Sequence, residues 1–467
     1  MQKYLSPEYD TIKKRLVQVG IRQILLVLSV LLWGYAFITS IIVSSPFFAD
    51  LRNRVVGARL MKDGLSPYFY IWHVNMPVRY YDTFVQQNTV FSKCTSSPAL
   101  NWLFTFFCDL PQYHINIFWF AIQWMCIAAI VWCGCKLAAT RMQKVSISLL
   151  AAFFSCSAGM RQHFFQGQIY LLVPACILLA IVCTPRKMNL ISCLIFGVCL
   201  SLVVFVRPTY ILLAIPFLFY KKYRSGLIAF GCLLSAYAIF AFQNKVQLKN
   251  WQDYTIVMKY FSTHYTFKTD TIVLEKDALP YTSVEGVQLD YQPPASMFDL
   301  GDGDSGEFSN YFPIHQRLFG TLPPFKLIVV FQIVGLIVGA LLILLILRKR
   351  TGQAFLGIMI VCCCVVWGLD FLMPVHKSLY YNVFLLLPVI LLLSLNTKLT
   401  RAVMGLTFLG LLLNTHSVKF LTMSYTVGQL LLLAACLLQV YANFFQTKYV
   451  TGKTKTYSTN KRSTTND

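Results

Sequence analysis

Phe47-Phe48-Ala49-Asp50-Leu51-Arg52 directly follows the first long apolar segment of the chain, residues 24–44. From Asp50 to Asp63, apolar and basic side chains are interleaved in a pattern that predicts a helix lying in the membrane interface. Gly64 can close this helix in the left-handed conformation, and Pro67 prevents it from resuming. The sequence therefore places a carboxylate just beyond the end of a membrane span.

Two explanations for Asp50 follow from this position. Its carboxylate can act as a helix N-cap, accepting backbone N–H groups at the positive end of the helix dipole. Alternatively, it serves a function at the membrane surface. Periodicity alone favours the N-cap.

The composition is typical of a polytopic membrane protein. Of the 467 residues, 57% are hydrophobic and 12% are charged, and the mean hydropathy is +0.61, which excludes a soluble enzyme. We predict an all-α bundle of about twelve transmembrane helices. The predicted spans are 24–44, 114–135, 145–160, 168–183, 189–206, 208–220, 225–243, 325–347, 353–371, 379–395, 402–415 and 424–445.

Basic residues predict the orientation. The loops on one side of the spans carry Lys and Arg but no acidic residue, among them Lys136, Arg186, Lys221, Arg348 and Lys398. The positive-inside rule puts these loops and both termini in the cytoplasm, and Asp50 outside. Topology and anionic lipids explain the net charge of +22, so nucleic acid is not an expected partner.

This topology divides the chain into a cytoplasmic lead (1–23), a transmembrane domain (24–447) and a basic, disordered cytoplasmic tail (448–467). The first span is expected to remain as a signal anchor. Two long outer loops are predicted, at 45–113 and 244–324. The acidic stretch 270–307 is interpreted as solvated, with weak calcium binding as the alternative. Cys94 and Cys108 are candidates for a disulfide, which the sequence leaves undecided.

Polar residues gather at the outer ends of later spans. Arg161-Gln162-His163 and Gln166-Gly167-Gln168 precede one predicted span, and Arg207-Pro208 ends another. Ionisable groups at such positions are costly unless they face a cavity, a partner or the headgroups. Snorkelling explains Arg207 equally well, and hydrogen bonds between helices explain His163 and Gln168. The short apolar piece 99–110 is expected to be re-entrant or interfacial.

Together these stretches resemble glycosyltransferase family 87, within the GT-C superfamily, whose members resemble polyprenyl-phosphate-mannose-dependent alpha-mannosyltransferases. Four stretches carry the similarity in family order: Asp50 with Gly57-Ala58 and Gly64-x-x-Pro67-Tyr68; Ser97-Pro98-Ala99-Leu100 through Asp109-Leu110-Pro111; Gln166-Gly167-Gln168; and Arg207-Pro208. The sequence departs from the family at three places: Tyr170, where Asn is common; Ser96-Ser97; and Ser378–Asn382, where a His-containing motif is expected and His376 is a candidate substitute.

The resemblance implies transfer of a hexose, with mannose as the first candidate, from a polyprenyl-phosphate donor to a lipid-linked or envelope glycan acceptor on the extracytoplasmic face. A base must take the hydroxyl proton as the new bond forms, and Asp50 is placed for this role. A single displacement with one carboxylate inverts the anomeric centre. No cofactor and no metal are expected, because the donor is a lipid monophosphate and the spans lack a His/Asp cluster.

The remaining site residues are assigned on the same resemblance. Cationic groups should meet the donor phosphate, and we expect Arg207 first, then Arg161 and His163. Substrate contacts are expected from a second set: Tyr68, Gln166, Gln168, His376 and Lys377. The protein is expected in a bacterial inner membrane, as a multi-pass monomer surrounded by lipid.

Two other functions fit the same pattern. An O-antigen polymerase or ligase also has many spans and a large outer loop, but it relies on loop Arg or His residues more than on an acid after the first span. A lipid-linked sugar flippase or other transporter would place broken helices and ionisable residues near the midplane. Here the polar residues lie at outer span ends, which favours an enzyme.

Overall fold

The computed structural model describes residues 7–44, 48–68, 77–80, 94, 96–184, 188–267, 311–321, 323–349, 353–373, 379–395, 400–415 and 424–445, and all regular secondary structure within them is helical. Six helical stretches are long and apolar enough to cross a membrane: Val19–Ser44, Gln112–Leu137, Lys221–Gln243, Phe325–Arg348, Ala354–Phe371 and Ser424–Phe444. Five shorter apolar helices accompany them. The chain is therefore a multi-pass, all-helical membrane protein in its described residues, and the predicted number of about twelve spans is not confirmed.

The first helix, α1 (Pro7–Ser44), is continuous through the expected lead and the first span. It packs against α5 (Arg141–Ser155) and α6 (Ala158–Gln166), while Ile24, Val30 and Leu31 are exposed along its outer side. Ser29 and Ser148 share a hydrogen bond of 2.9 Å between their hydroxyl oxygens, across α1 and α5. Such bonds hold apolar helices together where lipid, rather than water, surrounds them.

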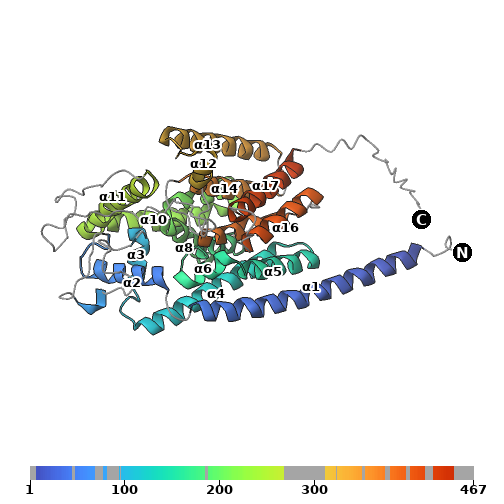
Figure 1. The fold of residues 1–467 in the computed structure, drawn as a ribbon, viewed down its shortest axis with the longest axis horizontal. Coiled ribbons are helices and arrows are strands. Elements are labelled where there is room, and N and C mark those ends of the chain that lie inside the picture. The colour runs from blue at the N-terminus through green and yellow to red at the C-terminus, as the bar shows by residue number, and fades with distance from the viewer. Residues whose placement is uncertain are drawn as a thin grey trace, which may run out of the picture.

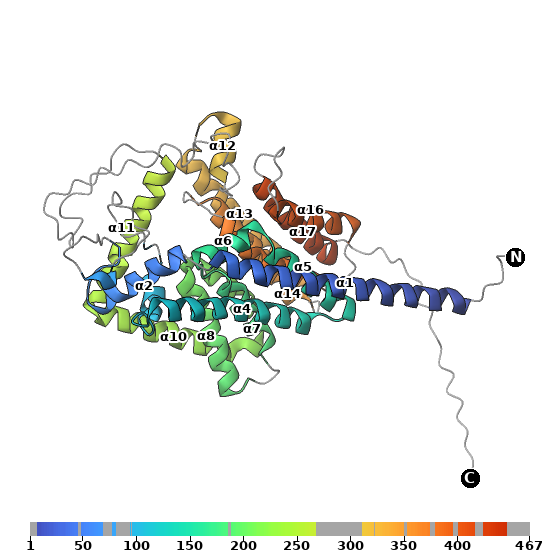
Figure 2. The same cartoon turned by 60° about the horizontal axis from the view of Figure 1, so that its bottom comes forward.

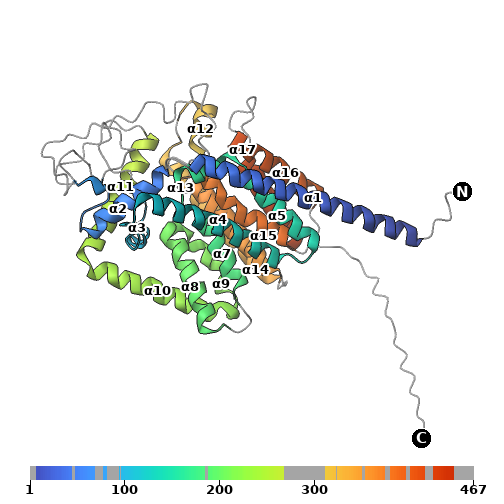
Figure 3. The ribbon, with the colours of Figure 1, turned by 90° about the horizontal axis from the view of Figure 1, so that it is seen from below.

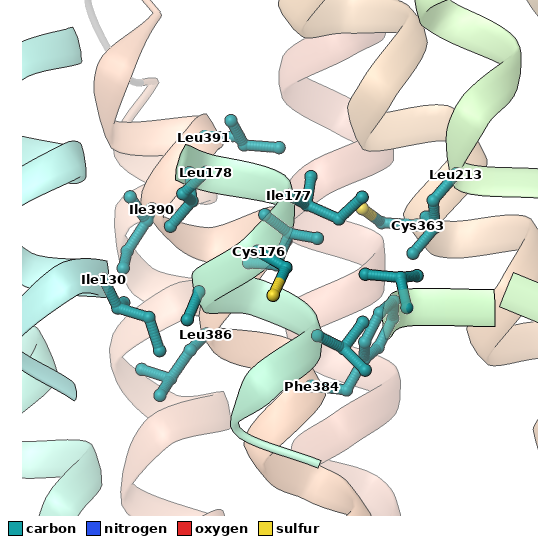
Figure 4. Close-up of a cluster of buried hydrophobic side chains, with 14 of the residues drawn as sticks. Ile130, Cys176, Ile177, Leu178, Leu213, Cys363, Phe384, Leu386, Ile390 and Leu391 are labelled. Carbon is teal, nitrogen blue, oxygen red and sulfur yellow. The ribbon is translucent and has the colours of Figure 1, made fainter. Parts of the chain in front are cut away.

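The centre of the bundle consists of helices too short to cross a membrane alone. α7 (Leu172–Val182) and α15 (Leu386–Ser394) are almost completely buried. Figure 4 shows Leu178 of α7 beside Ile390 and Leu391 of α15, with Ile130 of α4 (Gln112–Leu137) on the same side and Ile177 on the side of Cys363. Because neighbouring helices surround them, these segments need not match the thickness of the bilayer.

The other helices complete the bundle. The predicted span 145–160 is divided, because α5 ends at Ser155 and the Ser157 hydroxyl caps α6 by accepting a hydrogen bond from the backbone N–H of Met160. The remaining helical elements are α8 (Leu190–Val206), η3 (Pro208–Ala214), α9 (Ile215–Leu218), η4 (Lys221–Tyr223), α10 (Arg224–Gln243), α12 (Tyr311–Phe319), α13 (Phe325–Arg348), α14 (Ala354–Phe371), η6 (Leu379–Leu385), α16 (Arg401–Thr415) and α17 (Ser424–Phe444).

Three helices gather at the end of the molecule opposite the start of α1: α2 (Ala49–Lys62), α3 (Pro98–Phe104) and α11 (Lys245–Phe267) (Figures 1 and 2). The helix predicted at 50–63 is confirmed, and Gly64 follows it with a φ of 77°. Its apolar side chains do not face lipid as expected. Leu51, Val55 and Leu60 are fully buried, because α3 and α6 pack against α2. Protein therefore covers the apolar face of this helix, and its placement in the membrane interface stays a prediction.

The second predicted outer loop begins with structure. α11 occupies its first part and buries Gln247, Asn250 and Asp253. The acidic stretch 270–307 and the tail 448–467 lie outside the described residues, so both interpretations remain predictions. The division of the chain into lead, transmembrane domain and tail likewise remains a prediction.

Candidate functional site

The first turn of α2 positions Asp50. α2 begins at Ala49, and the preceding residue, Phe48, has a φ of 23° and provides no side-chain cap. Asp50 lies inside the first turn, so the N-cap explanation is wrong. Its Oδ2 instead accepts a hydrogen bond from Nε2 of Gln168. The N-terminal end of the helix dipole still favours a negative charge at this position.

A tight turn at the end of α6 positions Gln168. Gly167 ends the helix with a φ of 63°, and a Cβ at this position would lie 2.7 Å from Cδ1 of Phe48 and 2.8 Å from Cβ of Leu51. Only glycine allows the turn to approach the start of α2 this closely. Gln168 also donates to Oε1 of Gln166 at 3.1 Å. The structure therefore brings Asp50, Gln166 and Gln168 together.

Arg54 is a site residue that the sequence reasoning missed. Its side chain is buried, and it donates to Oε1 of Gln168 at 2.6 Å, to the carbonyl of Gly167 at 3.1 Å and to Oγ of Ser96 at 3.1 Å. Residues four apart share one face of a helix, so Arg54 and Asp50 meet the same glutamine. The signal available in the sequence was an acidic and a basic residue four positions apart on an otherwise apolar helix face.

His163 supports this turn from within the protein. It has no exposed surface, its Nδ1 lies 3.2 Å from Oε1 of Gln123, and its Nε2 accepts the backbone N–H of Leu171 at 3.4 Å. Burial, and then the positive charge of Arg54, lower the pKa of His163 to about 3. The imidazole is therefore neutral at ordinary pH, which removes the positive charge on which the expected phosphate contact was based.

Arg207 ends α8 and turns inward. Its Nη1 forms an ion pair of 3.0 Å with Oδ2 of Asp370 at the end of α14, and its Nη2 lies 3.1 Å from Sδ of Met373. The guanidinium carbon is 5.6 Å from the ring centroid of Tyr381. The Arg207 side chain is 18% exposed, so it is held by protein groups instead of snorkelling to the headgroups. Asp370, the partner, was not among the predicted site residues.

Tyr170 lies between the Asp50 cluster and Arg207. It follows Gln168 by two residues, and its ring stacks on Tyr380 and contacts Tyr381, with centroid separations of 5.8 and 4.4 Å. Tyr381 in turn lies beside Arg207. Tyr170, which departs from the expected Asn, thus places an aromatic ring two residues from Gln168 and against the Tyr381 ring that lies beside Arg207.

Residues 97–272 match glycosyltransferase family 87. This match confirms the expected family. The matched segment begins at α3 and reaches α11, and it contains Gln166, Gln168 and Arg207 but not Asp50. Neither the search of curated proteins nor the search of solved structures returned a match. The match to this family over residues 97–272, together with the apolar helices, points to a membrane glycosyltransferase.

In this glycosyltransferase, Ser96 and Ser97 join the outer helices. The Ser97 hydroxyl donates to the carbonyl of Phe205 near the end of α8, and it accepts the backbone N–H of Leu100 at 3.2 Å as the cap of α3. The Ser96 hydroxyl accepts a hydrogen bond from Arg54. The Ser96 backbone carbonyl accepts a second one from the Tyr68 hydroxyl, at 2.7 Å. These two residues therefore link α2, α3 and α8.

The other predicted site residues are Tyr68, Arg161, His376 and Lys377. Tyr68 is fully buried against Tyr254, with ring centroids 5.7 Å apart, so its ring offers no open face for a sugar. Arg161 lies on α6, partly exposed, and forms no ion pair with the described residues. His376 and Lys377 lie outside the described residues.

The cysteines and acids of the described part offer no metal site. No group of three or more His, Cys, Asp or Glu side chains there is arranged to hold a metal ion. Cys94 and Cys108 are both free thiols, so the possible disulfide does not form. Asn101 donates to Sγ of Cys94 at 3.2 Å, which explains why this thiol is buried beside α3.

An apolar groove opens beside the polar clusters. It has a volume of about 370 Å³ and lies between α3, α8 and α10, three helices that Figure 3 shows close together. Its wall is almost entirely apolar and includes aromatic side chains, among them Phe205, two residues before Arg207. The lining residues are Trp102, Leu103, Val198, Ser201, Leu202, Phe205, Leu233, Ala236, Tyr237 and Phe240.

Proposed function

We propose that this glycosyltransferase moves a hexose, with mannose as the first candidate, from a polyprenyl-phosphate donor to a glycan or glycolipid acceptor on the extracytoplasmic face. The observation that carries the proposal is the Asp50 carboxylate, fixed by Gln168, which Arg54 fixes in turn. Holding one carboxylate oxygen with a partly buried chain of hydrogen bonds costs free energy, and a need to orient that carboxylate explains the arrangement.

Asp50 acts in this proposal as the general base. The acceptor oxygen attacks the anomeric carbon, its proton passes to Asp50, and the bond between the anomeric carbon and the phosphate oxygen breaks. The electron pair leaves with the phosphate as polyprenyl phosphate. One displacement inverts the anomeric centre, so a beta-linked donor gives an alpha product.

Arg207 is the group proposed to meet the donor phosphate. It ends α8 beside the groove wall at Phe205 and carries five N–H donors, some of which contact Asp370, Met373 and the Tyr210 hydroxyl. The other donors suit the oxygens of a phosphate group. His163, being neutral, is assigned instead to holding the Gln168 turn.

The groove between α3, α8 and α10 is proposed to take the polyprenyl chain. It is lined by apolar side chains, and its Phe205 end lies two residues from Arg207. A lipid chain lying there would place its phosphate at the end of α8. Burial of prenyl carbons against aromatic rings would contribute to donor affinity.

The test compares Asp50→Asn with Asp63→Asn, an acid at the other end of α2 that pairs with Arg79 at 2.7 Å on the protein surface. Each variant is expressed in cells lacking the protein, and lipid-linked glycans are analysed by mass spectrometry. Asp50→Asn should leave an intermediate short by one hexose, because loss of a general base costs about 10²–10⁴-fold in rate.

The control defines the outcome. Asp63→Asn should restore the full-length glycan, since a surface ion pair contributes little to stability. If Asp50→Asn restored the full-length glycan at the same protein level, Asp50 would not be the general base. An unchanged glycan profile in cells without the protein would remove the proposed transfer itself.

A further inference from the structure

The ion pair between Arg207 and Asp370 is built from distant parts of the chain. Arg207 caps α8, and Asp370 lies in the last turn of α14. The two side chains are 18% and 7% exposed, and they approach to 3.0 Å. Tyr210 adds a long contact of 3.5 Å from its hydroxyl to the same carboxylate oxygen.

This pair is poorly arranged for stability. Both contacts converge on Oδ2 of Asp370, while Oδ1 is buried and makes no hydrogen bond with the residues that the structure describes. A buried carboxylate oxygen without a donor costs free energy, and a buried ion pair often contributes less to stability than apolar side chains of similar volume. We therefore look to function for the reason that Asp370 lies here.

The chemistry of the proposed donor supplies that reason. The donor phosphate is a diester with one negative charge. After transfer, the polyprenyl phosphate is a monoester that carries about −1.5 to −2 at pH 7. An Arg207 without a counter-charge would therefore bind the product more tightly than the donor, and product release would be slow.

We propose that Asp370 is a positioning residue that holds Arg207 at the end of α8 and reduces its attraction for the product phosphate. This inference rests on the proposed function, in which Arg207 meets the donor phosphate. Asp370 acts through the guanidinium and touches no substrate itself. The Tyr381 ring and Met373 Sδ keep the guanidinium in place from the other sides.

The test measures kcat, donor KM and the inhibition constant of added polyprenyl phosphate, on full-length protein in lipid nanodiscs. Asp370→Asn keeps the size of the side chain but removes its charge. We expect the inhibition constant to fall about tenfold and kcat to fall with it, while donor KM does not rise. A purely structural role would lower the active fraction and leave the inhibition constant unchanged, which would overturn the inference.

Asp253→Asn is the matched control. Asp253 is a buried acid on α11 that accepts the Ser66 hydroxyl at 2.6 Å, outside the Arg207 pair. The Asp253→Asn substitution should leave the inhibition constant for polyprenyl phosphate unchanged. An equal fall in this variant would show that any buried Asp-to-Asn change produces the effect, and would overturn the specific role of Asp370.

Two further variants separate the inference from the proposed function and protect the test from misfolding. Arg207→Gln should raise donor KM; if it does not, the phosphate assignment itself fails. Arg207→Gln combined with Asp370→Asn leaves no uncompensated buried charge, so it should fold where Asp370→Asn does not. In the Arg207→Gln background, Asp370→Asn should lower the inhibition constant by less than in the unmodified protein, because no guanidinium remains for Asp370 to hold. An equal fall in both backgrounds would mean that Asp370 acts independently of Arg207.

Discussion

At the scale of single residues, the candidate site depends on how closely the Gly167 turn approaches α2. Gly167 has a positive φ, and the Phe48 ring and Leu51 occupy the space where a side chain would lie. The carbonyl of Gly167 accepts Nε1 of Trp119 at 3.0 Å in addition to Arg54. The position of Gln168, and through it of Asp50, is thus determined by a residue that carries no functional group.

Gly167→Ala should therefore impair both folding and activity, whereas Gly64→Ala should impair folding only slightly. Gly64 also has a positive φ, 77°, but a Cβ there would meet nothing within 4 Å. Backbone strain alone costs about 1 kcal/mol, while the overlap at Gly167 adds about 1–3 kcal/mol. Thermal unfolding and sugar transfer measured on both variants check this difference. Equal losses in the two would show that the contact with Phe48 and Leu51 is unimportant.

At the scale of elements, two apolar grooves of similar size provide a comparison. The groove between α3, α8 and α10 lies beside Arg207, whereas a second groove of about 320 Å³ lies between α13 and α14 and includes Gly335. Both would contact lipid in a membrane. The first is lined by Phe205, whose carbonyl accepts the Ser97 hydroxyl, whereas the second approaches the Arg207 pair from the other side, through Leu369 and Leu372 next to Asp370.

Filling the first groove with Ala236→Trp should raise KM about tenfold for a donor with a long polyprenyl chain, because apolar surface of the chain is no longer buried. A donor with a short, water-soluble prenyl chain should be used as before. Gly335→Trp in the second groove is the control and should change neither value. Equal effects of Ala236→Trp on both donors would place the lipid chain elsewhere.

At the scale of the whole molecule, the orientation in the membrane decides whether the proposal is possible. α2, α3 and α11 gather at one end, and the start of α1 is at the other (Figure 1). The basic loops predict that the α2 end faces outward. Asp50 can take part in extracytoplasmic transfer only if this orientation is correct.

Cysteines introduced at the two ends test the orientation. Val78 on the short helix η2 (Val78–Tyr80) is 78% exposed near α2, and Met142 is 43% exposed at the start of α5. In intact cells, a membrane-impermeant thiol reagent should label Val78→Cys above the level of the unmodified protein, and Met142→Cys only after permeabilisation. The reverse pattern would put Asp50 inside the cell and contradict the proposed reaction.

The sequence by itself determined the helical membrane class, the helix after the first span and its end at Gly64, because these depend on local periodicity and on backbone freedom at one residue. It also found Gln168 and Arg207 as unusual polar residues at span ends. It did not show that α3 and α6 cover the apolar face of α2, because an apolar helix face indicates burial but does not tell whether lipid or protein provides it.

Only the tertiary structure decided the partners. Arg54 reaching Gln168, His163 enclosed and neutral, and Asp370 paired with Arg207 all join segments far apart in the chain, and no local pattern encodes which buried polar groups meet. In a low-dielectric interior, each buried charge and hydrogen-bonding group needs a partner. The packing of the helices determines which groups are close enough to be that partner.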